Sequence, residues 1–286
     1  MDKQKQRRFE ITASLIKTPE GRARYAASLT QPLRKRRDYQ SVARKAFYVE
    51  QLPDGAIPIY DKDADVTAYI VGEEGMNIVS TQKPKRVAFP LFEITANPEV
   101  PLTEIKAKRF DLLERSIDFG KAMIGAEEDR KVFATMEALA ADPTAPNATI
   151  NVTGNLTANA IIDAWGQVTR NDIRVQNIFM NAIDYKDILK FDRDTLDPVS
   201  QGALLKSGIM ANMWGSNIIV SRIVPEGSVY VCGEPEFFGR MPIRTDLTVI
   251  SADDPKNRIV GFSMFEQLGI GLYNGLAMCK LNITRV

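Results

Sequence analysis

Three pairs of adjacent carboxylates come nearest, by residue type and spacing, to an acid–base site. The pairs are Glu73/Glu74, Glu127/Glu128 and Asp253/Asp254. Two carboxylates held close together can divide the roles of general acid and general base. However, the first and last pairs lie in turn-like stretches, and the middle pair lies in a helical pattern, where adjacent residues do not share a face. We interpret each pair as solvated charge, and a carboxylate- or lysine-dependent enzyme stays open as an alternative.

The chain contains no histidine, and its two cysteines have no metal-binding spacing. Histidine is the commonest general base, so catalytic triads, His-assisted nucleophiles and the usual zinc sites are excluded. Cys232 and Cys279 form no disulfide framework and fit a reducing compartment. The sequence has neither a GxxxxGK[ST] phosphate loop nor GxGxxG, and it has no apolar run of transmembrane length. We therefore predict no catalytic residue, no cofactor, no metal and no membrane span.

The charge of the chain is unevenly distributed. Residues 1–45 hold 13 Lys/Arg against 4 Asp/Glu, which leaves 24 against 32 for the remainder of the 286 residues. Arg34, Lys35, Arg36 and Arg37 form the densest basic cluster. A basic arm joined to an acidic body indicates contact with polyanions or with acidic faces of neighbouring copies. A solvated, frayed terminus and a soluble nucleic-acid-binding protein that uses this cluster are the alternatives.

The element that organises the rest is a predicted helix over Thr103–Ala141. The stretch has no proline, Thr103 can cap its start, and Asp142-Pro143 stops it. Its apolar pattern changes side near Gly125. The first stripe comprises Ile105, Leu112, Leu113, Ile117, Met123 and Ile124, and the second comprises Val132, Phe133, Met136 and Leu139. Either the helix bends near Gly125, or different parts of the protein cover its two halves.

Before this helix, Ala46–Val100 has the character of β-strands and turns. Its prolines and charges are typical of edge strands rather than of a central sheet. We predict a long two-stranded excursion that reaches away from the body. Because an isolated hairpin is only marginally stable in water, it should lie on something else, and a neighbouring subunit is the most plausible support.

After a linker at Ala141–Gly154, helices and strands alternate, which predicts an α/β layer with a mixed sheet. The expected helices are Thr157–Thr169 and Ala182–Phe191. The expected strands are Ile173–Met180, Asn217–Val224, Ser228–Cys232, Met241–Ile250, Arg258–Met264 running on toward Ile270, and Leu276–Ile283.

This order of elements resembles the tailed-bacteriophage major capsid proteins of the Hong Kong 97 type. The local matches, each weak alone, are Ala68–Gly75 in an extended loop, Phe89–Ile94 in its returning strand, Gly125–Phe133 at the end of a spine helix, Trp214–Ser221 in a strand, and Arg258–Ala277 in the closing strands. Tyr69-Ile70-Val71 stands where a tryptophan is usual, and Asn217 stands where proline is common. The resemblance covers about Ala46–Val286.

The resemblance implies an α+β fold with four parts. These are a basic N-terminal arm at 1–45, an extended β-loop at 46–100, a peripheral domain with the spine helix at 101–148 and 249–286, and an α/β axial domain at 149–248. It further implies a non-enzymatic shell subunit. Copies would form hexamers and pentamers in an icosahedral head around double-stranded DNA, located in the virion and assembled in the host bacterial cytoplasm.

The resemblance also implies partners: other copies of the chain, packaged DNA bound without sequence specificity, and portal, scaffold or decoration proteins. The intersubunit contacts are expected at Arg34, Lys35, Arg36, Arg37, Tyr69, Glu73, Glu74, Lys83, Lys85 and Arg86. For the arm, contact with neighbouring subunits is favoured over contact with DNA phosphates. A bacterial encapsulin compartment is the close alternative.

Overall fold

The computed structural model describes residues 41–53, 55–62, 85–103, 111–143, 149–191, 212–254 and 256–285, which lie within one compact unit, 39–286. Its helices are η1 (Ala43–Ala46), α4 (Asp111–Ala141), α5 (Ala158–Thr169), α6 (Ala182–Ile188), α8 (Pro235–Phe238) and η3 (Gly275–Ala277). Its strands are β1 (Tyr48–Gln51), β2 (Ile59–Lys62), β3 (Lys85–Ala88), β4 (Leu91–Ala96), β5 (Glu99–Pro101), β6 (Thr149–Thr153), β7 (Val175–Met180), β8 (Asn212–Met213), β9 (Ser216–Val220), β10 (Ser228–Gly233), β11 (Gly239–Ser251), β12 (Ile259–Gly269), β13 (Gly271–Leu272) and β14 (Met278–Thr284).

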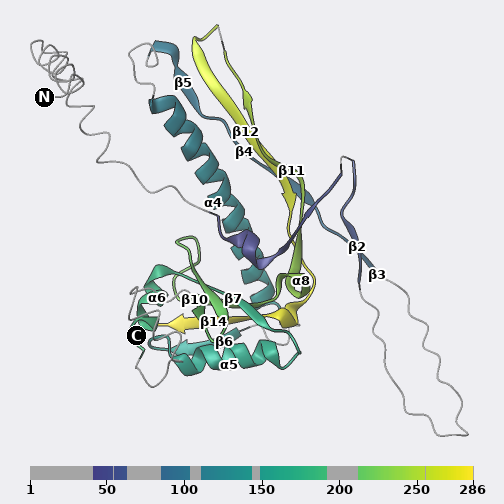
Figure 1. Cartoon of the computed structure of the whole chain (residues 1–286), viewed down its shortest axis with the longest axis vertical. Helices are drawn as coiled ribbons and strands as arrows, with labels where there is room; N and C mark the ends of the chain where they lie inside the picture. Colours follow the sequence, from purple (N-terminus) through teal and green to yellow (C-terminus); the bar gives the residue numbers. More distant parts are fainter. Residues whose placement is uncertain are drawn as a thin grey trace, which may run out of the picture. The chain divides into compact units, whose positions relative to one another are not determined.

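A first sheet lies alongside α4 (Figure 1). Its described strands have the order β1-β11-β12-β4, with β13 paired to β11 and β5 paired to β12. Ile124 of α4 packs with Ile94 and Met264 from β4 and β12 in a small buried cluster. Gly120 allows this close approach, because a Cβ at that position would lie 2.8 Å from the terminal carbon of Met264.

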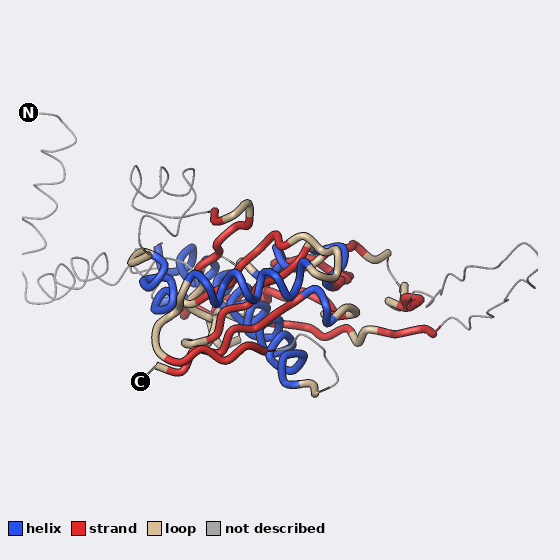
Figure 2. The backbone as a smooth tube through the Cα atoms, turned by 90° about the horizontal axis from the view of Figure 1, so that it is seen from below, coloured by secondary structure: helices blue, strands red, loops and turns tan. Residues whose placement is uncertain are grey.

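A second, mixed sheet has the order β6-β14-β10-β7-β9-β8 among the described residues. Strands β6/β14 and β7/β9 pair in parallel, and the other neighbours pair antiparallel. Helix α5 lies across this sheet, in front of the strands when seen from below (Figure 2). The Thr157 side chain caps α5 by accepting a hydrogen bond from the backbone N–H of Ala160. The buried face of α5 includes Ala160, Ile161, Ala164 and Val168.

The two halves of α4 are covered by different parts of the protein, which confirms one of the two alternatives predicted from its pattern. Ile124 belongs to the small cluster, whereas Val132, Phe133 and Met136 belong to the main core against the second sheet. The helix ends at Ala141, as predicted, because Pro143 cannot continue it. Two expectations were wrong: Met123 is 52% exposed, and Thr103 is already helical rather than a cap.

The excursion predicted over Ala46–Val100 is shorter than expected. Among the residues of this segment that the structure describes, only β2 and β3 form a separate two-stranded ribbon. Strand β1 pairs in parallel with β11, and β4 pairs antiparallel with β12, so both flanks of the segment belong to the first sheet. Their partners lie far away in the sequence, which is why local composition gave no sign of them. Residues 63–84 lie outside the described part.

Most strands and both helices predicted after residue 154 are confirmed at their expected places. Sheet membership, however, does not follow the predicted division at 248/249. Strand β11 begins at Gly239 and belongs to the first sheet, whereas β14 pairs with β10 and β6 in the second. The residues 249–286 are therefore shared between both sheets, and the domain limits stay a prediction.

Two glycines with opposite surroundings test this packing. Gly227 has φ +77°, and a Cβ there would lie 2.7 Å from the Ile283 carbonyl oxygen. We expect Gly227→Ala to lower the free energy of unfolding by about 1–3 kcal/mol through its backbone conformation alone.

Gly166 lies in α5 with open space around it. Gly166→Ala should instead stabilise the protein by about 0.5–1 kcal/mol. Thermal unfolding of both variants measures this, and equal effects would contradict the described packing.

Candidate functional site

Most residues predicted to make intersubunit contacts lie outside the described residues. These are Arg34, Lys35, Arg36, Arg37, Tyr69, Glu73, Glu74 and Lys83. Lys85 and Arg86 lie on β3, and Arg86 forms an exposed ion pair with Asp61 on β2, with 3.0 Å between Nε and Oδ1. Such a pair contributes only about 0–1 kcal/mol. What the structure does show is where the ribbon and the N-terminal segment are attached to the body.

The ribbon is attached through a clamp that we call the ribbon anchor: Tyr48, Glu50, Tyr60 and Arg240. The Tyr60 hydroxyl donates to Oε2 of Glu50 at 2.9 Å, and Nη1 of Arg240 donates to the same oxygen at 3.2 Å. The Arg240 guanidinium lies 5.0 Å from the ring centre of Tyr60 and 5.6 Å from that of Tyr48. Cation–π contacts of this kind contribute about 0.5–2 kcal/mol each.

The electrostatics of the ribbon anchor keep Tyr60 protonated. Burial, the hydrogen bond to Glu50 and the charge of Glu50 raise the pKa of Tyr60 to about 12, against the lowering effect of Arg240. Tyr60 also packs on Phe89, with 5.2 Å between ring centres. Nη2 of Arg244 donates to the Ala56 carbonyl at 2.6 Å. Together these contacts fix the base of the ribbon against β1 and β11.

The N-terminal segment is attached through Asp129, a fully buried residue of α4. Its carboxylate accepts hydrogen bonds from the Ser41 hydroxyl at 2.7 Å and from the backbone N–H groups of Val42 and Ala43, both at 3.1 Å. The first N–H groups of a helix have no partner within the helix. Asp129 therefore supplies, from a different element, the acceptor that a capping residue normally provides for η1.

Arg44 completes this attachment, and we call Arg44, Glu128, Asp129, Asp246 and Glu266 the arm anchor. Nε and Nη2 of Arg44 donate to the two oxygens of Glu128 at 2.8 and 3.1 Å. Nη2 also reaches Oε2 of Glu266 at 3.1 Å, and Nη1 reaches Asp246 at 3.2 Å. Burial alone would lower the pKa of Arg44, but its hydrogen bonds and the carboxylate charges raise it. One guanidinium thus joins η1 to α4, β11 and β12.

A third charged group ties α4 to the second sheet. Nζ of Lys280 lies 2.5 Å from Oε1 of Glu137, and the Tyr230 hydroxyl donates to Oε2 of Glu137 at 2.7 Å. Burial would raise the pKa of Glu137, but the hydrogen bonds from Lys280 and Tyr230 lower it. Because Lys280 is on β14 and Tyr230 is on β10, this pair fixes the C-terminal half of α4 over two strands.

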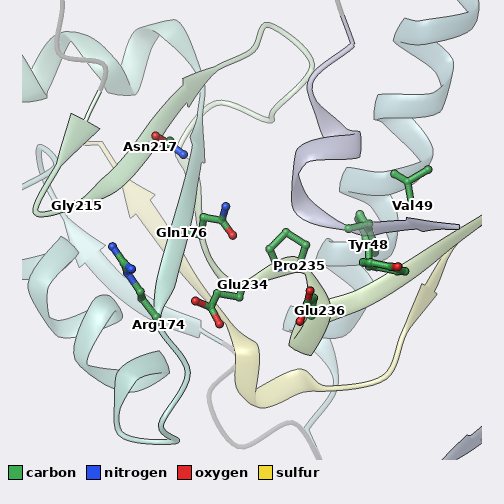
Figure 3. A pocket seen from close by; sticks show the side chains of 10 residues that line it. Tyr48, Val49, Arg174, Gln176, Gly215, Asn217, Glu234, Pro235 and Glu236 are labelled. Atoms are coloured by element: carbon green, nitrogen blue, oxygen red, sulfur yellow. The ribbon is translucent and has the colours of Figure 1, made fainter.

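An open hollow of about 790 Å³ lies between β1, β7, β9 and α8 (Figure 3). It is lined by Phe47, Tyr48, Val49, Arg174, Gln176, Gly215, Asn217, Glu234, Pro235 and Glu236. Figure 3 shows Arg174 and Gln176 on one side, with Glu234 and Glu236 near α8. Among the described residues, no group of three or more His, Cys, Asp or Glu side chains is placed to hold a metal ion.

The structure corrects the interpretation of one carboxylate pair. Glu127 is partly exposed and pairs with Arg130, but the adjacent Glu128 is buried, so the reading of both as solvated charge was wrong for Glu128. Asp254 accepts hydrogen bonds from Lys256 and Asn257 in a turn, as predicted. The first pair lies outside the described residues.

Sequence reasoning missed the residues of both anchors. Glu266 did have a recognisable signal: it alternates with Met264 and Leu268 on β12, so it occupies an inward position between two buried apolar residues. A carboxylate at such a position needs a buried cation. Arg44 and Arg240 had no comparable signal, because their partners lie 84 to 222 and 190 residues away in sequence.

Comparison with known proteins found similarity only at the level of structure. No family model matches the sequence, and no curated protein matches it. Among solved structures, the capsid of the cyanophage P-SCSP1u has a TM-score of 0.69 at 11% identity, covering 88% of this chain and 90% of that chain. A structure from Microbacterium phage Oxtober96 has a TM-score of 0.65 at 18% identity, covering 87% and 93%.

A virus-like particle from Pyrococcus furiosus is also similar, with a TM-score of 0.56 at 15% identity, covering 85% of this chain and 93% of that chain. These likenesses confirm the predicted Hong Kong 97-type α+β fold over almost the whole length of both partners in each comparison. Among the described helices, none combines the length and the apolar character that crossing a bilayer needs.

Removal of the Asp129 carboxylate should weaken the arm anchor. Asp129→Ala leaves the buried N–H of Ala43 without its acceptor, which costs about 1–3 kcal/mol. The N–H of Val42 and the Ser41 hydroxyl also lose their acceptor, but both are partly buried and cost less because water can reach them. We expect a loss of about 2–5 kcal/mol in the free energy of unfolding. Asp118→Ala, at an exposed position of the same helix, should change it by less than about 0.5 kcal/mol. Equal losses in denaturant titrations would exclude this role for Asp129.

Proposed function

We propose that this chain is the major capsid protein of a tailed bacteriophage, a structural subunit that assembles as hexamers and pentamers into an icosahedral head around double-stranded DNA. The observation that carries the proposal is the similarity of fold to phage capsid structures, which extends over 87–88% of this chain and 90–93% of those chains. Fold alone does not determine function. The surface of the ribbon therefore provides the second line of support.

The ribbon and the residues just before β2 expose apolar side chains that they cannot bury by themselves. Ile57 is 70% exposed, Ile59 is 50% exposed and Val87 is 43% exposed. Val87 is opposite Tyr60 and Ile59 is opposite Ala88, so Ile59 and Val87 lie on opposite faces of the ribbon. A two-stranded ribbon with exposed apolar side chains on both faces is marginally stable in water, and uncovered apolar side chains on a projection are typical of an interaction site. A second copy of the chain is the partner that a shell supplies at every such ribbon.

The proposal also assigns a role in the shell to each part of the chain. The basic arm at 1–45 and the β-loop at 46–100 contact neighbouring subunits. Helix α4 with the first sheet, β11 included, forms the peripheral domain, and the second sheet with α5, β14 included, forms the axial domain. Lys85 and Arg86 on β3 take part in contacts between subunits. Portal, scaffold and decoration proteins are further partners, and the particle assembles in the bacterial cytoplasm.

A second candidate is an encapsulin-type protein compartment, which the similarity to the Pyrococcus furiosus virus-like particle favours. The contents of the purified particle separate the two. A phage head holds nuclease-protected double-stranded DNA, or is empty when the protein is expressed alone, and cargo enzymes are absent from it. A cargo protein that copurifies at constant stoichiometry would support the compartment and contradict the head.

The ribbon is tested by charge substitution. Ile57→Asp and Ile59→Asp place a carboxylate on the apolar surface, so assembly should fall at least tenfold while thermal unfolding of the unassembled chain changes little. Ile57→Val and Ile59→Val keep an apolar side chain and serve as matched controls that assemble normally. Light scattering coupled to gel filtration measures both. Normal assembly of the two aspartate variants would show that this surface is not an interface.

A further inference from the structure

Strand β1 has a free edge within the described part of the chain, because β11 is its one neighbour in the first sheet. Directly after β1, the backbone N–H of Leu52 donates to the Ile243 carbonyl oxygen on β11. Successive residues of a strand direct their backbone groups to alternate sides, so Val49 and Gln51 direct theirs away from β11. Neither has a backbone partner on that side in the described ranges. Such an edge is a template for pairing with another chain.

The open hollow of about 790 Å³ lies along this edge (Figure 3). Tyr48 and Val49 both line it, although consecutive side chains of a strand point to opposite faces of the sheet. A space that both side chains line therefore lies at the edge of the strand. Gln176 and Asn217 line the opposite side of the hollow, and both are exposed. Their amides can donate to and accept from the backbone of an extended segment, so the hollow suits one added strand.

Two carboxylates and one guanidinium border the hollow. Glu234 and Glu236 lie on either side of Pro235 at the start of α8, and Arg174 lies just before β7. Complementary charges across an interface favour the right partner and disfavour others. A segment that pairs with β1 here should therefore carry more positive than negative charge.

The segment 9–15 of the basic arm has both the strand pattern and this charge. Its apolar and polar residues alternate without exception, with Phe9, Ile11, Ala13 and Leu15 against Glu10, Thr12 and Ser14. This alternation predicts a strand with one apolar face. Arg7 and Arg8 precede the segment, and Glu10 is its one acid, which complements two carboxylates and one guanidinium. The segment belongs to residues 1–40, outside the described part.

Residues 64–70 alternate in a similar way, but their charge has the wrong sign. Asp63 and Asp65 lie at the start of that stretch, and Glu73 and Glu74 follow it. Like charges placed opposite each other across an interface are unfavourable, and Glu234 and Glu236 carry the same charge as these acids. The charges therefore favour the arm segment.

We propose that β1 accepts residues 9–15 of a second copy of the chain as an added strand, with Arg7 and Arg8 of that copy facing Glu234 and Glu236. Each copy gives one strand and accepts one, which is a head-to-tail contact of the kind that closes rings of subunits. The proposal rests on the proposed shell function and adds the place on the body where the arm of a neighbour is held.

Disulfide trapping between two full-length variants tests this contact. One variant carries Thr12→Cys or Ala13→Cys, adjacent positions that cover both faces of the segment, and the other carries Gln51→Cys. When the two are assembled together with oxidised glutathione, one of the mixtures should form a linked dimer. Its yield should exceed about tenfold that of a control in which Glu93→Cys, at the opposite edge of the sheet, replaces Gln51→Cys. The native Cys232 and Cys279 are buried.

Charge reversal tests the specificity of the contact. Arg7→Glu combined with Arg8→Glu should lower the yield of linked dimer about fivefold, and adding Glu234→Lys and Glu236→Lys should restore it to within about twofold. Arg7→Lys with Arg8→Lys keeps the positive charge and serves as the matched control with unchanged yield. A loss that the compensating substitutions do not restore would overturn the pairing of these charges.

Light scattering of the same mixtures separates this proposal from the shell function. Normal particles without the linked dimer would overturn the added strand and leave the shell function standing, whereas a monomeric chain would contradict both. A link between positions 12 or 13 and 51 within one chain would exclude the second copy as donor. If a cysteine variant fails to fold, hydrogen exchange of the wild type replaces it. The amides of Val49 and Gln51 should exchange about tenfold more slowly in particles than in dissociated subunits, and equal rates would overturn the proposal.

Discussion

Burial of carboxylates on α4 is the constraint on which the arrangement of this chain depends. A single buried charge costs several kcal/mol unless it is paired and hydrogen-bonded. Glu128 and Asp129 are buried side by side on the helix, and both find their partners in Ser41–Arg44. The start of the described chain is therefore fixed to the middle of α4. Strand β1 begins only a few residues later, at Tyr48, so the same contact also sets the direction in which the chain enters the first sheet.

Apolar packing holds some elements together, and charged contacts hold others. The main core packs the C-terminal half of α4 on the second sheet, where Phe133 lies 5.8 Å from Phe179 and 5.9 Å from Tyr230 between ring centres. The ribbon has no such core, and the clamp of Arg240 on Tyr60 and Glu50 holds its base. This arrangement positions the ribbon while leaving Ile59 and Val87 exposed, as the proposed contact with another copy requires.

The sequence predicted those features that arise from local patterns. Helix α5 follows from the Thr157 cap and the spacing of its apolar residues, and α4 ends where Pro143 forbids a further turn. The apolar residues of α4 change from one side of the helix to the other near Gly125, which predicted that different parts of the protein cover its two halves. The fold itself was recognised from the order of weakly matching segments, and the structural comparisons confirm it.

Features that depend on distant partners could not be predicted in the same way. The parallel pairing of β1 with β11 joins residues about 190 positions apart, and no local sequence pattern predicts such a contact. Glu128 was interpreted as solvated because its cation, Arg44, is 84 residues away. In contrast, the alternation around Glu266 contained usable information: a carboxylate between Met264 and Leu268 must face the interior. Eight of the ten predicted contact residues lie outside the described part of the chain.

Electron cryomicroscopy of the purified, full-length protein is the most direct test of the account. It predicts closed icosahedral particles in which Ile59 of each ribbon and Ile57, just before the ribbon, lie against an adjacent subunit. A homogeneous population of monomers, or particles in which these two side chains face solvent, would contradict it.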